Sequence, residues 1–423
     1  MNILILGSGG REHTFCWKLS QSPKCKNLYV SPGNAGTAAI ATNLGIPVLD
    51  FKSIKVAVIK NNIQMVIVGP EAPLVEGIKE FFQSDTQLSK VSLIGPNSEA
   101  AKLEGSKSFA KKFMNKYKIP TAKYSEFTSS SLSQAFEFLE TMTPPYVLKA
   151  DGLAGGKGVL IIEDIDKAKK ELKSMLLNKK FGKASEKVVI EEFLNGIELS
   201  CFIISDGKTG ITFPMAKDYK KIGEADTGLN TGGMGAVSPV PFVDIEFQKK
   251  IDEKIIKPTL RGLKSENMLY QGFIFIGLIN VDGEPMVIEY NVRMGDPETE
   301  VVIPRIKNDF VSLFQAVSNQ NLKTIKLKID KRVAVTVMSV SGGYPEKYNK
   351  GYAIKGLENI KDAIIFHSGT IIEGDKVLTN GGRVLTLTGL GNSMQEALKK
   401  SYKGLKEIQF KGMYYRNDIG FDL

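Results

Sequence analysis

The sequence predicts a multidomain protein of the α/β and α+β classes whose first domain is a doubly wound parallel sheet. The chain has 423 residues, enough for two to four domains with well-buried cores. Residues 1–103 alternate short apolar runs with amphipathic segments, which is the rhythm of consecutive βαβ units. From residue 104 onward this alternation gives way to hairpins and glycine-rich stretches, so a second architecture begins there.

In the first segment the expected elements are, in order, a strand at 2–7, a helix at 11–22, a strand at 27–33, a helix at 51–62, a strand at 63–70, a helix at 74–84 and a strand at 91–96. The strands are continuous apolar runs, as expected for strands buried on both faces. Loops rich in glycine and proline follow the strands, at 7–12, 31–37, 69–74 and 95–107. In such a sheet the ligand site lies at the carboxyl ends of the strands.

The first of these loops, GSGGRE at 7–12, departs from the G-x-G-x-x-G pattern of dinucleotide-binding folds. The second strand ends in Ser31, where such folds place an acidic residue for a ribose. A nicotinamide cofactor is therefore not expected. The helix N-terminus at Gly10–Arg11 is suited to an anion such as a sugar phosphate. A plain tight loop is the alternative for each loop taken alone.

The middle segment is expected to contain helices at 106–117, 131–142 and 165–178, strands at 146–150, 158–162 and 187–194, and a hairpin at 271–293 that turns at Asp282–Gly283. A glycine-rich stretch at 226–241 is expected to break the pattern. The last segment is expected to contain strands at 332–345, 364–370 and 383–391 and a helix at 393–405.

Composition excludes several classes of protein. Hydrophobic residues make up 42% and charged residues 24%, as in soluble globular proteins. No apolar run approaches the roughly 18 residues of a membrane span, and the start lacks the basic region of a signal peptide. Three cysteines without metal-binding spacing favour a cytoplasmic location.

The net charge of +10 favours a solvated lysine-rich surface with local phosphate sites. The lysines are spread along the chain and form no basic arm, so a nucleic-acid partner is not expected. With only two histidines, His13 and His367, catalysis built on histidine has little to draw on.

The stretch KADGLAGGKGV at 149–159 joins two expected strands. It is not a P-loop of the G-x-x-x-x-G-K-[ST] type, because Val159 follows Gly158. It predicts a flexible hairpin flap over phosphates, with backbone N–H groups and Lys149 or Lys157 as donors. A mobile surface hairpin is the alternative.

A second pattern lies in VIEYNVR at the end of the expected hairpin. Glu289, Asn291 and Arg293 are spaced by two, which places all three on one face of a strand. Carboxylate and amide oxygens suit Mg²⁺, and an arginine beside them suits a phosphate or carboxylate. A solvated strand face is the alternative. The acids that follow could form a plain acidic turn: Asp296, Glu298 and Glu300.

A third pattern is the strand 187–194, which runs into a short connector. Backbone groups there can contact an adenine, and Glu198 can reach ribose hydroxyls. Taken alone, a buried strand edge is the simpler interpretation.

In this order, a lysine on a strand, a glycine-rich flap, an acidic connector and a terminal E-x-N-x-R strand resemble the ATP-grasp fold. More narrowly, the chain resembles the glycinamide ribonucleotide synthetases (phosphoribosylamine–glycine ligases) along nearly its whole length. The matching motifs lie at 7–13, 69–78, 95–111, 149–159, 226–235, 293–300, 341–345 and 379–391. Three positions depart from the family pattern: Met294 replaces Phe, Glu300 replaces Gln and Val237 replaces an aromatic residue.

The resemblance implies three domains. Residues 1–103 form a substrate-binding α/β domain, and residues 104–325 form an ATP-grasp domain with a mobile lid at about 122–192. Residues 326–423 form a small C-terminal mixed α/β domain. A monomer is the family expectation.

The resemblance also implies the reaction: ligation of glycine to 5-phosphoribosylamine with ATP, through glycyl phosphate, giving glycinamide ribonucleotide, ADP and phosphate in purine biosynthesis. Phosphoryl transfer needs charge neutralisation and positioning rather than a side-chain nucleophile, and a lid protects the acyl phosphate from water. The expected cofactors are ATP with Mg²⁺ or Mn²⁺. The expected partners are small molecules only, without nucleic acid or membrane. The alternatives are another ATP-grasp ligase or carboxylase, and a non-catalytic nucleotide-binding regulator.

The site residues carried over by the resemblance fall into four groups. The ATP site is expected to contain Lys107, Lys149, Gly152, Gly155, Gly156, Lys157, Gly158, Glu191, Phe193, Leu194 and Glu198. The substrate site is expected to contain Gly9, Gly10, Arg11, Glu12, Glu71, Asp218, Gly232, Gly233 and Arg293. Glu289 and Asn291 are the expected metal ligands. The expected catalytic residues are Arg293, Lys149 and Asp218.

Overall fold

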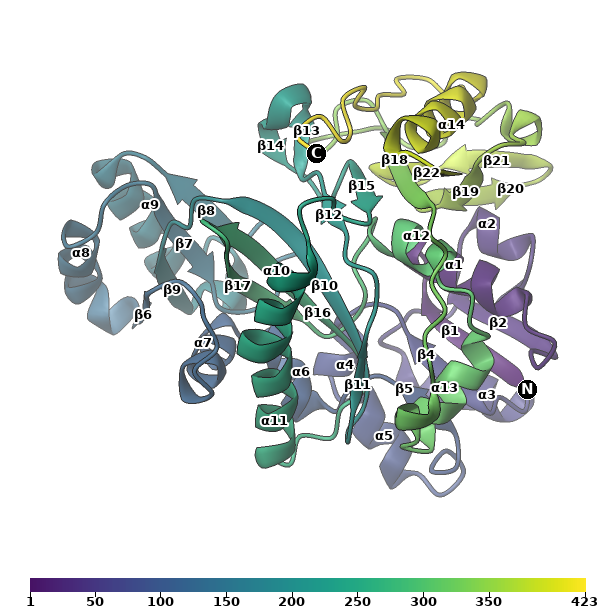
Figure 1. Ribbon diagram of the computed structural model, residues 1–423, viewed down its shortest axis with the longest axis horizontal. Coiled ribbons are helices and arrows are strands. Elements are labelled where there is room, and N and C mark those ends of the chain that lie inside the picture. The colour runs from purple at the N-terminus through teal and green to yellow at the C-terminus, as the bar shows by residue number, and fades with distance from the viewer.

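The N-terminal sheet is parallel throughout and has the order β3-β2-β1-β4-β5 in a computed structural model that describes residues 1–423 (Figure 1). Its strands are β1 (Asn2–Gly7), β2 (Asn27–Pro32), β3 (Thr42–Asn43), β4 (Met65–Val68) and β5 (Ser92–Ile94). Ile3 and Ile5 enter one apolar core, whereas Leu4 and Leu6 enter another. Because both faces of β1 are buried, the expected doubly wound sheet is confirmed.

The helices of this segment differ from expectation in three places, the first being a short helix at Ala35–Ala38 that was not expected. They are α1 (Gly10–Ser20), α2 (Ala35–Ala38), α3 (Phe51–Lys60), α4 (Ala72–Val75), α5 (Ile78–Ser84), α6 (Ser98–Gly105) and α7 (Lys107–Lys116). The single helix expected at 74–84 is divided, because Gly77 adopts φ +81° between α4 and α5. The loop expected at 95–107 contains α6, whose first turn is capped where the Asn97 side chain accepts from the Ala100 N–H at 3.0 Å.

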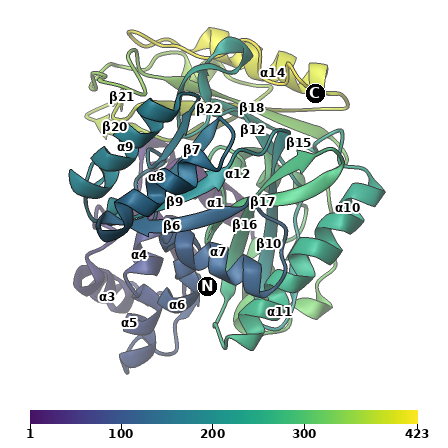
Figure 2. The same ribbon diagram turned by 90° about the vertical axis from the view of Figure 1, so that its left-hand side faces the viewer.

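A second, antiparallel sheet has the order β6-β9-β7-β8 and projects from one side of the molecule (Figures 1 and 2). Its strands are β6 (Tyr124–Thr128), β7 (Tyr146–Ala150), β8 (Val159–Ile162) and β9 (Lys187–Glu192). Helices α8 (Leu132–Glu140) and α9 (Ile165–Leu177) pack on it around a separate apolar core. We call residues 124–192 the lid.

The central sheet has the order β11-β10-β16-β17. Its strands are β10 (Ile197–Asp206), β11 (Gly210–Thr212), β16 (Gln271–Val281) and β17 (Glu284–Asn291). The expected hairpin turns at Asp282 (φ +50°) and Gly283 (φ +82°), as a two-residue turn requires. Three features were not predicted from the sequence. Two are the strands β10 and β11, and the third is a continuous helical stretch beside the sheet formed by α10 (Ile245–Ile251), a π-helical turn (Asp252–Ile256) and α11 (Lys257–Ser265).

The C-terminal sheet has the order β12-β15-β18-β22-β19. Its strands are β12 (Lys217–Asp218), β15 (Gly235–Ser238), β18 (Val333–Val340), β19 (Ile364–His367) and β22 (Arg383–Gly391), and α14 (Met394–Glu407) packs on it. The stretch 226–241 therefore does not break the pattern, since it contains β14 (Thr227–Asn230) and β15. Two strands of the middle segment, β12 and β15, thus complete the C-terminal sheet. The boundaries of the three domains remain predictions.

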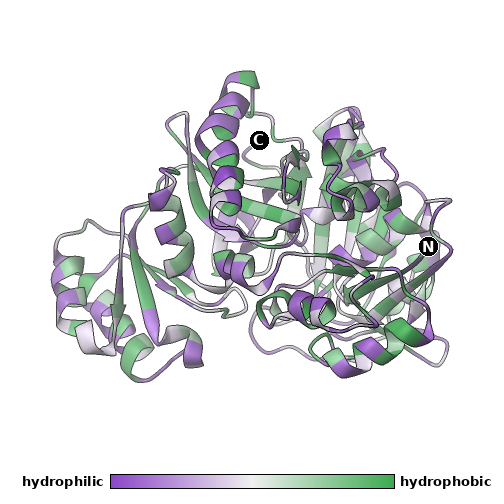
Figure 3. Ribbon diagram, turned by 90° about the horizontal axis from the view of Figure 1, so that it is seen from below, coloured by the Kyte–Doolittle hydropathy of each residue, from purple (hydrophilic) through white to green (hydrophobic).

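The remaining elements are short. They are β13 (Lys221–Gly223), which pairs with β14, β20 (Thr370–Glu373), which pairs with β21 (Lys376–Thr379), and helices α12 (Thr299–Val302) and α13 (Phe310–Ser318). Figure 3 shows hydrophobic residues gathered on the strands and hydrophilic residues along the outer sides of the helices. None of the helices has both the length and the apolar character needed to cross a bilayer.

Candidate functional site

The end of β17 brings Glu289, Asn291 and Arg293 together. Arg293 Nη2 donates to Asn291 Oδ1 at 3.1 Å, and Asn291 Nδ2 lies 3.5 Å from Glu289 Oε1. Tyr290 points to the opposite side, where its hydroxyl bonds to Thr259 at 2.6 Å. Strand β17 ends at Asn291, so the expected strand spacing of two holds for Glu289 and Asn291 but does not extend to Arg293.

Glu289 is surrounded by positive charge. Lys107, at the first position of α7, places its Nζ 3.4 Å from Glu289 Oε2. Burial alone would raise the pKa of Glu289, but Lys107, Lys220, Lys149 and Arg293 outweigh it and lower the pKa to about 2. Glu289 is therefore a carboxylate at any working pH. Its oxygens and the Asn291 amide oxygen are the hard ligands that a divalent cation prefers.

Lys149, at the end of β7, is held by Glu191 of the neighbouring strand β9. Lys149 Nζ lies 2.9 Å from Glu191 Oε2 and donates to the Ile288 carbonyl at 3.3 Å. Lys111 Nζ contacts the same Glu191 oxygen at 2.8 Å. The other oxygen, Oε1, is buried and has no hydrogen-bond partner. Lys111 was not predicted as a site residue, although its spacing of four from Lys107 on one helix face could have identified it.

The flap between β7 and β8 extends into solvent. A Cβ added to Gly155 (φ +57°) or Gly156 (φ +77°) would meet no other atom within 4 Å, and Lys157 is exposed without an ion-pair partner. The base of the flap is fixed, because the Gly152 N–H donates to the Ala184 carbonyl at 3.1 Å. The flap thus has a hydrogen-bonded base and a solvent-exposed tip.

The connector after β9 carries the residues expected around the nucleoside. Phe193 is 40% exposed and Leu194 is half-buried. Glu198, at the start of β10, forms an ion pair with Lys220, which lowers the pKa of Glu198. Lys220 is a further site residue that was not predicted from the sequence.

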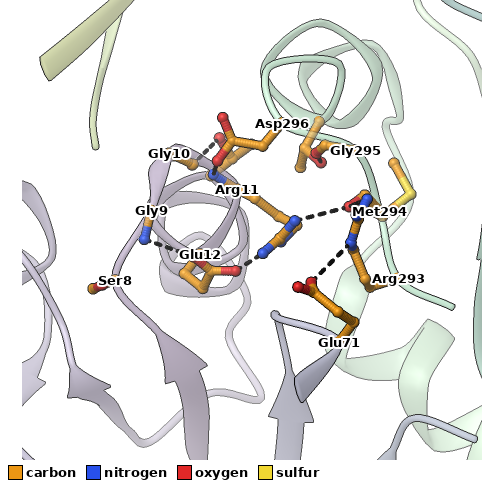
Figure 4. Close-up of polar contacts among 12 residues, drawn as sticks. Ser8, Gly9, Gly10, Arg11, Glu12, Glu71, Arg293, Met294, Gly295 and Asp296 are labelled. Carbon is orange, nitrogen blue, oxygen red and sulfur yellow. Dashed lines mark hydrogen bonds and ion pairs between the residues drawn. The ribbon is translucent and has the colours of Figure 1, made fainter. Parts of the chain in front are cut away.

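Figure 4 shows the start of α1 facing the turn after β17. The Gly9 N–H donates to Glu12 Oε2 at 2.6 Å, and the Arg11 N–H donates to Asp296 Oδ2 at 3.3 Å. The Arg11 side chain donates to Glu12 at 2.7 Å and to the Met294 carbonyl at 3.1 Å. These amide groups at the helix N-terminus, expected to receive an external anion, are already paired with carboxylates of the chain itself.

Arg293 is held by two glutamates, Glu71 at the start of α4 and Glu104 in α6. Its Nε lies 3.4 Å from Glu71 Oε2, and its Nη2 lies 2.7 Å from Glu104 Oε1. The other Glu104 oxygen accepts from the Val292 N–H at 2.7 Å. Burial is the main cause that raises the pKa of Glu104, although Arg293 acts in the opposite direction. Glu104 was missed because its helix, α6, was interpreted as a loop.

Asp218 and the Gly232–Gly233 loop lie on the side of the C-terminal sheet. Burial raises the pKa of Asp218. Burial and the neighbouring Asp218 raise the pKa of Glu298 to about 7, and Glu298 accepts from the Ser200 hydroxyl at 3.0 Å. Glu298 is therefore a buried carboxyl group next to Asp218 rather than part of a solvent-exposed acidic turn.

This arrangement matches that of known proteins. Three family profiles match the chain: Phosphoribosylglycinamide synthetase, N domain, at residues 1–104; its ATP-grasp (A) domain at 105–299; and its C domain at 334–422. A phosphoribosylamine–glycine ligase of Fusobacterium nucleatum is 45% identical over 99% of this chain and 98% of that protein.

The crystal structure of the Thermotoga maritima phosphoribosylamine–glycine ligase has a TM-score of 0.86 and 35% identity, covering 99% of this chain and all of that one. The biotin carboxylase domain of the Hydrogenobacter thermophilus 2-oxoglutarate carboxylase shares the fold alone, with a TM-score of 0.72 and 13% identity over 98% of this chain and 91% of that one. The expected central ATP-grasp fold is thus confirmed. The three family profiles and the full-length relatives show that the chain belongs to the phosphoribosylglycinamide synthetase family.

Proposed function

We propose that this site joins glycine to 5-phosphoribosylamine, using ATP and giving glycinamide ribonucleotide, ADP and phosphate, as a step of purine biosynthesis. The names of the full-length relatives support this activity. The observation that carries it is the cluster around β17: Glu289 and Asn291, two oxygen-bearing side chains suited to a cation, lie among Lys107, Lys149 and Arg293. No side-chain nucleophile is needed for such chemistry.

The lysines and the flap bind the phosphates of ATP in this proposal. Lys107 and Lys149 neutralise charge on the transferred phosphoryl group, and the flap from Gly152 to Gly158 closes over it. Glu289 and Asn291 fit Mg²⁺ or Mn²⁺, which supplies charge neutralisation when bound. The related biotin carboxylase domain was solved with MgADP, which supports the magnesium assignment.

The adenosine lies against the lid in this proposal. The buried Glu191 Oε1, which has no partner, is an acceptor suited to the amino group of adenine. Phe193 and Leu194 supply apolar surface for the base. Glu198 accepts from ribose hydroxyls once its ion pair with Lys220 rearranges or is shared.

Glycine and phosphoribosylamine react between the N-terminal loop and the turn after β17. A carboxylate oxygen of glycine attacks the γ-phosphorus, ADP leaves, and glycyl phosphate forms. The amine of phosphoribosylamine then attacks the acyl carbon, phosphate leaves with the glycine oxygen, and the amine loses a proton to solvent. Arg293 stabilises the charge that travels through these steps. Gly9 to Glu12, Glu71, Asp218, Gly232 and Gly233 hold the substrates.

Isotope transfer tests this route. Glycine labelled with ¹⁸O in its carboxylate should give phosphate carrying one ¹⁸O per turnover, measured by mass spectrometry or ³¹P NMR. Unlabelled phosphate would show that ATP cleavage does not pass through the acyl group. ADP release that needs neither glycine nor phosphoribosylamine would instead favour another ligase or carboxylase of this fold, and nucleotide binding without turnover would favour a regulator. We further propose that the protein works as a cytoplasmic monomer on small molecules, without nucleic acid or membrane.

A further inference from the structure

The backbone of Gly232 is held on both sides by side chains of the C-terminal segment. Gly232 lies in the loop between β14 and β15. Its N–H donates to the Tyr344 hydroxyl at 3.0 Å, and its carbonyl accepts from Arg383 Nη1 at 2.6 Å. Tyr344 follows β18 and Arg383 begins β22, so both residues lie more than 100 positions further along the chain.

Arg383 also holds the turn that follows β17. Its Nη1 donates to the Asp296 carbonyl at 2.6 Å and lies 3.0 Å from Asp296 Oδ1. The second carboxylate oxygen of Asp296 accepts the N–H of Arg11 at the start of α1, as Figure 4 shows. One guanidinium therefore links the Gly232 loop, the Asp296 turn and, through Asp296, the N-terminal helix.

The fit around this guanidinium is close. A Cβ added to Gly232 would lie 3.0 Å from Arg383 Cζ, and one added to Gly233 would lie 2.4 Å from Pro297 Cδ. The Arg383 side chain is 21% exposed and that of Asp296 is 9% exposed. The loop thus lies directly against Arg383 and the turn.

We propose that Arg383 and Tyr344 are positioning residues of the ligase reaction. They hold the Gly232–Gly233 loop and the Asp296 turn at a fixed separation, so that phosphoribosylamine is aligned with the activated glycine. This inference rests on the proposed substrate role of Gly9 to Glu12, Gly232 and Gly233. It assigns a role in the site to two side chains from the C-terminal segment.

The reach of one nitrogen favours arginine over lysine at this position. Two carbonyl oxygens and a carboxylate oxygen converge on Nη1, at the far end of the Arg383 guanidinium. A lysine carries the charge, but its amine lies one bond closer to the backbone and cannot contact all three acceptors without a displacement. Arg383→Lys should therefore retain part of the function that Arg383→Ala loses, and Tyr344→Phe should lose only one neutral hydrogen bond.

Steady-state kinetics test the proposal, with phosphoribosylamine and ATP titrated separately. Arg383→Lys should lower kcat/KM for phosphoribosylamine roughly 10²-fold, because a displacement of about 1 Å is worth that much. Arg383→Ala should lower it further, and Tyr344→Phe should lower it roughly fivefold. The KM for ATP should stay within about twofold of the parent in all three, since the flap and β17 ligands are untouched.

Matched controls separate positioning from stability. Tyr348→Phe removes only the hydroxyl from the ring that packs beside Tyr344, with centroids 6.1 Å apart, and Arg332→Lys alters a half-exposed arginine of the same segment. Both should leave the kinetics unchanged. Equal effects of Arg383→Lys on the KM for both substrates, or a lower melting temperature with unchanged kinetics, would overturn the proposal. Parent enzyme without ligase activity would refute the proposed function instead.

Discussion

Glu300 is a carboxyl group buried where nothing pairs with it, and its replacement by glutamine should stabilise the protein. The side chain is 0% exposed, and neither oxygen has a hydrogen-bond partner. It lies against the start of α1, since a Cβ added to Gly10 would be 2.2 Å from Glu300 Oε1 and 2.8 Å from Ser368 Oγ. Burial, reinforced by Asp296, raises the pKa of Glu300 well above its ordinary value of 4.5.

The sign of the effect follows from proton linkage. Below pH 4.5 both the folded and the unfolded chain carry the proton on Glu300, so its titration does not change the free energy of unfolding there. As pH rises above that value, the unfolded chain releases the proton while the folded chain retains it. The folded state then loses about 1.4 kcal/mol per pH unit until the raised pKa is passed. At pH 7 the loss reaches at most ~3.4 kcal/mol, and Glu300→Gln removes it.

Thermal unfolding at two pH values measures this effect. With an unfolding entropy of about 2.1 cal/mol/K per residue, Glu300→Gln should raise Tm by roughly 4 °C at pH 7 and by roughly 1.5 °C at pH 5.5. Glu407→Gln, at an exposed glutamate, is the matched control and should change Tm little. An equal Tm shift at both pH values, or a lower Tm for Glu300→Gln, would refute the reasoning. Glutamine is also the residue that the family pattern predicts at this position.

Three further predictions concern the site. Glu289→Ala should lower turnover roughly 10²-fold or more in a Mg²⁺-dependent assay. Val292→Ala, which shortens a side chain that is only 2% exposed, should mainly lower stability. Equal losses of turnover in the two folded variants would contradict the assignment of Glu289 to the metal-binding face of β17. Amide hydrogen exchange at Gly152 to Gly158 should be fast in the free protein and slow with ATP and Mg²⁺, and exchange that ignores both would argue against a closing flap. Lys111→Gln should raise the KM for ATP roughly tenfold, because Glu191 loses one of its two charged partners. An unchanged KM would mean that Glu191 holds Lys149 in place without help from Lys111.

Much of the fold follows from periodicity in the sequence. The parallel sheet was predictable because its strands are apolar on both faces, and the hairpin of β16 and β17 was predictable from Asp282–Gly283. The helical stretch 245–265 was not identified, since Pro258 lies within it. A π-helical turn at Asp252–Ile256 lies within this stretch, immediately before α11, and loosens the backbone bonding that a proline disrupts.

The site was predictable where its residues share one element. A spacing of two on β17 placed Glu289 beside Asn291, and a spacing of that kind can be read from the sequence directly. Glu104 and Arg383 reach the site from a helix and a strand far away in sequence. Their contacts depend on how whole elements pack, and one sequence alone contains no signal for that packing.

The pairing of β15 with β18 has a consequence for synthesis of the chain on the ribosome. β15 ends at Ser238, but its partner strand is complete only at Val340, about 100 residues later. At roughly 5–20 residues per second, the nascent chain carries an unpaired apolar strand edge for about 5–20 s. The N-terminal sheet can form during this interval, whereas the C-terminal sheet cannot form until the final quarter of the chain has been synthesised. Slow translation after residue 238 would therefore prolong exposure of this edge to chaperones and to other nascent chains.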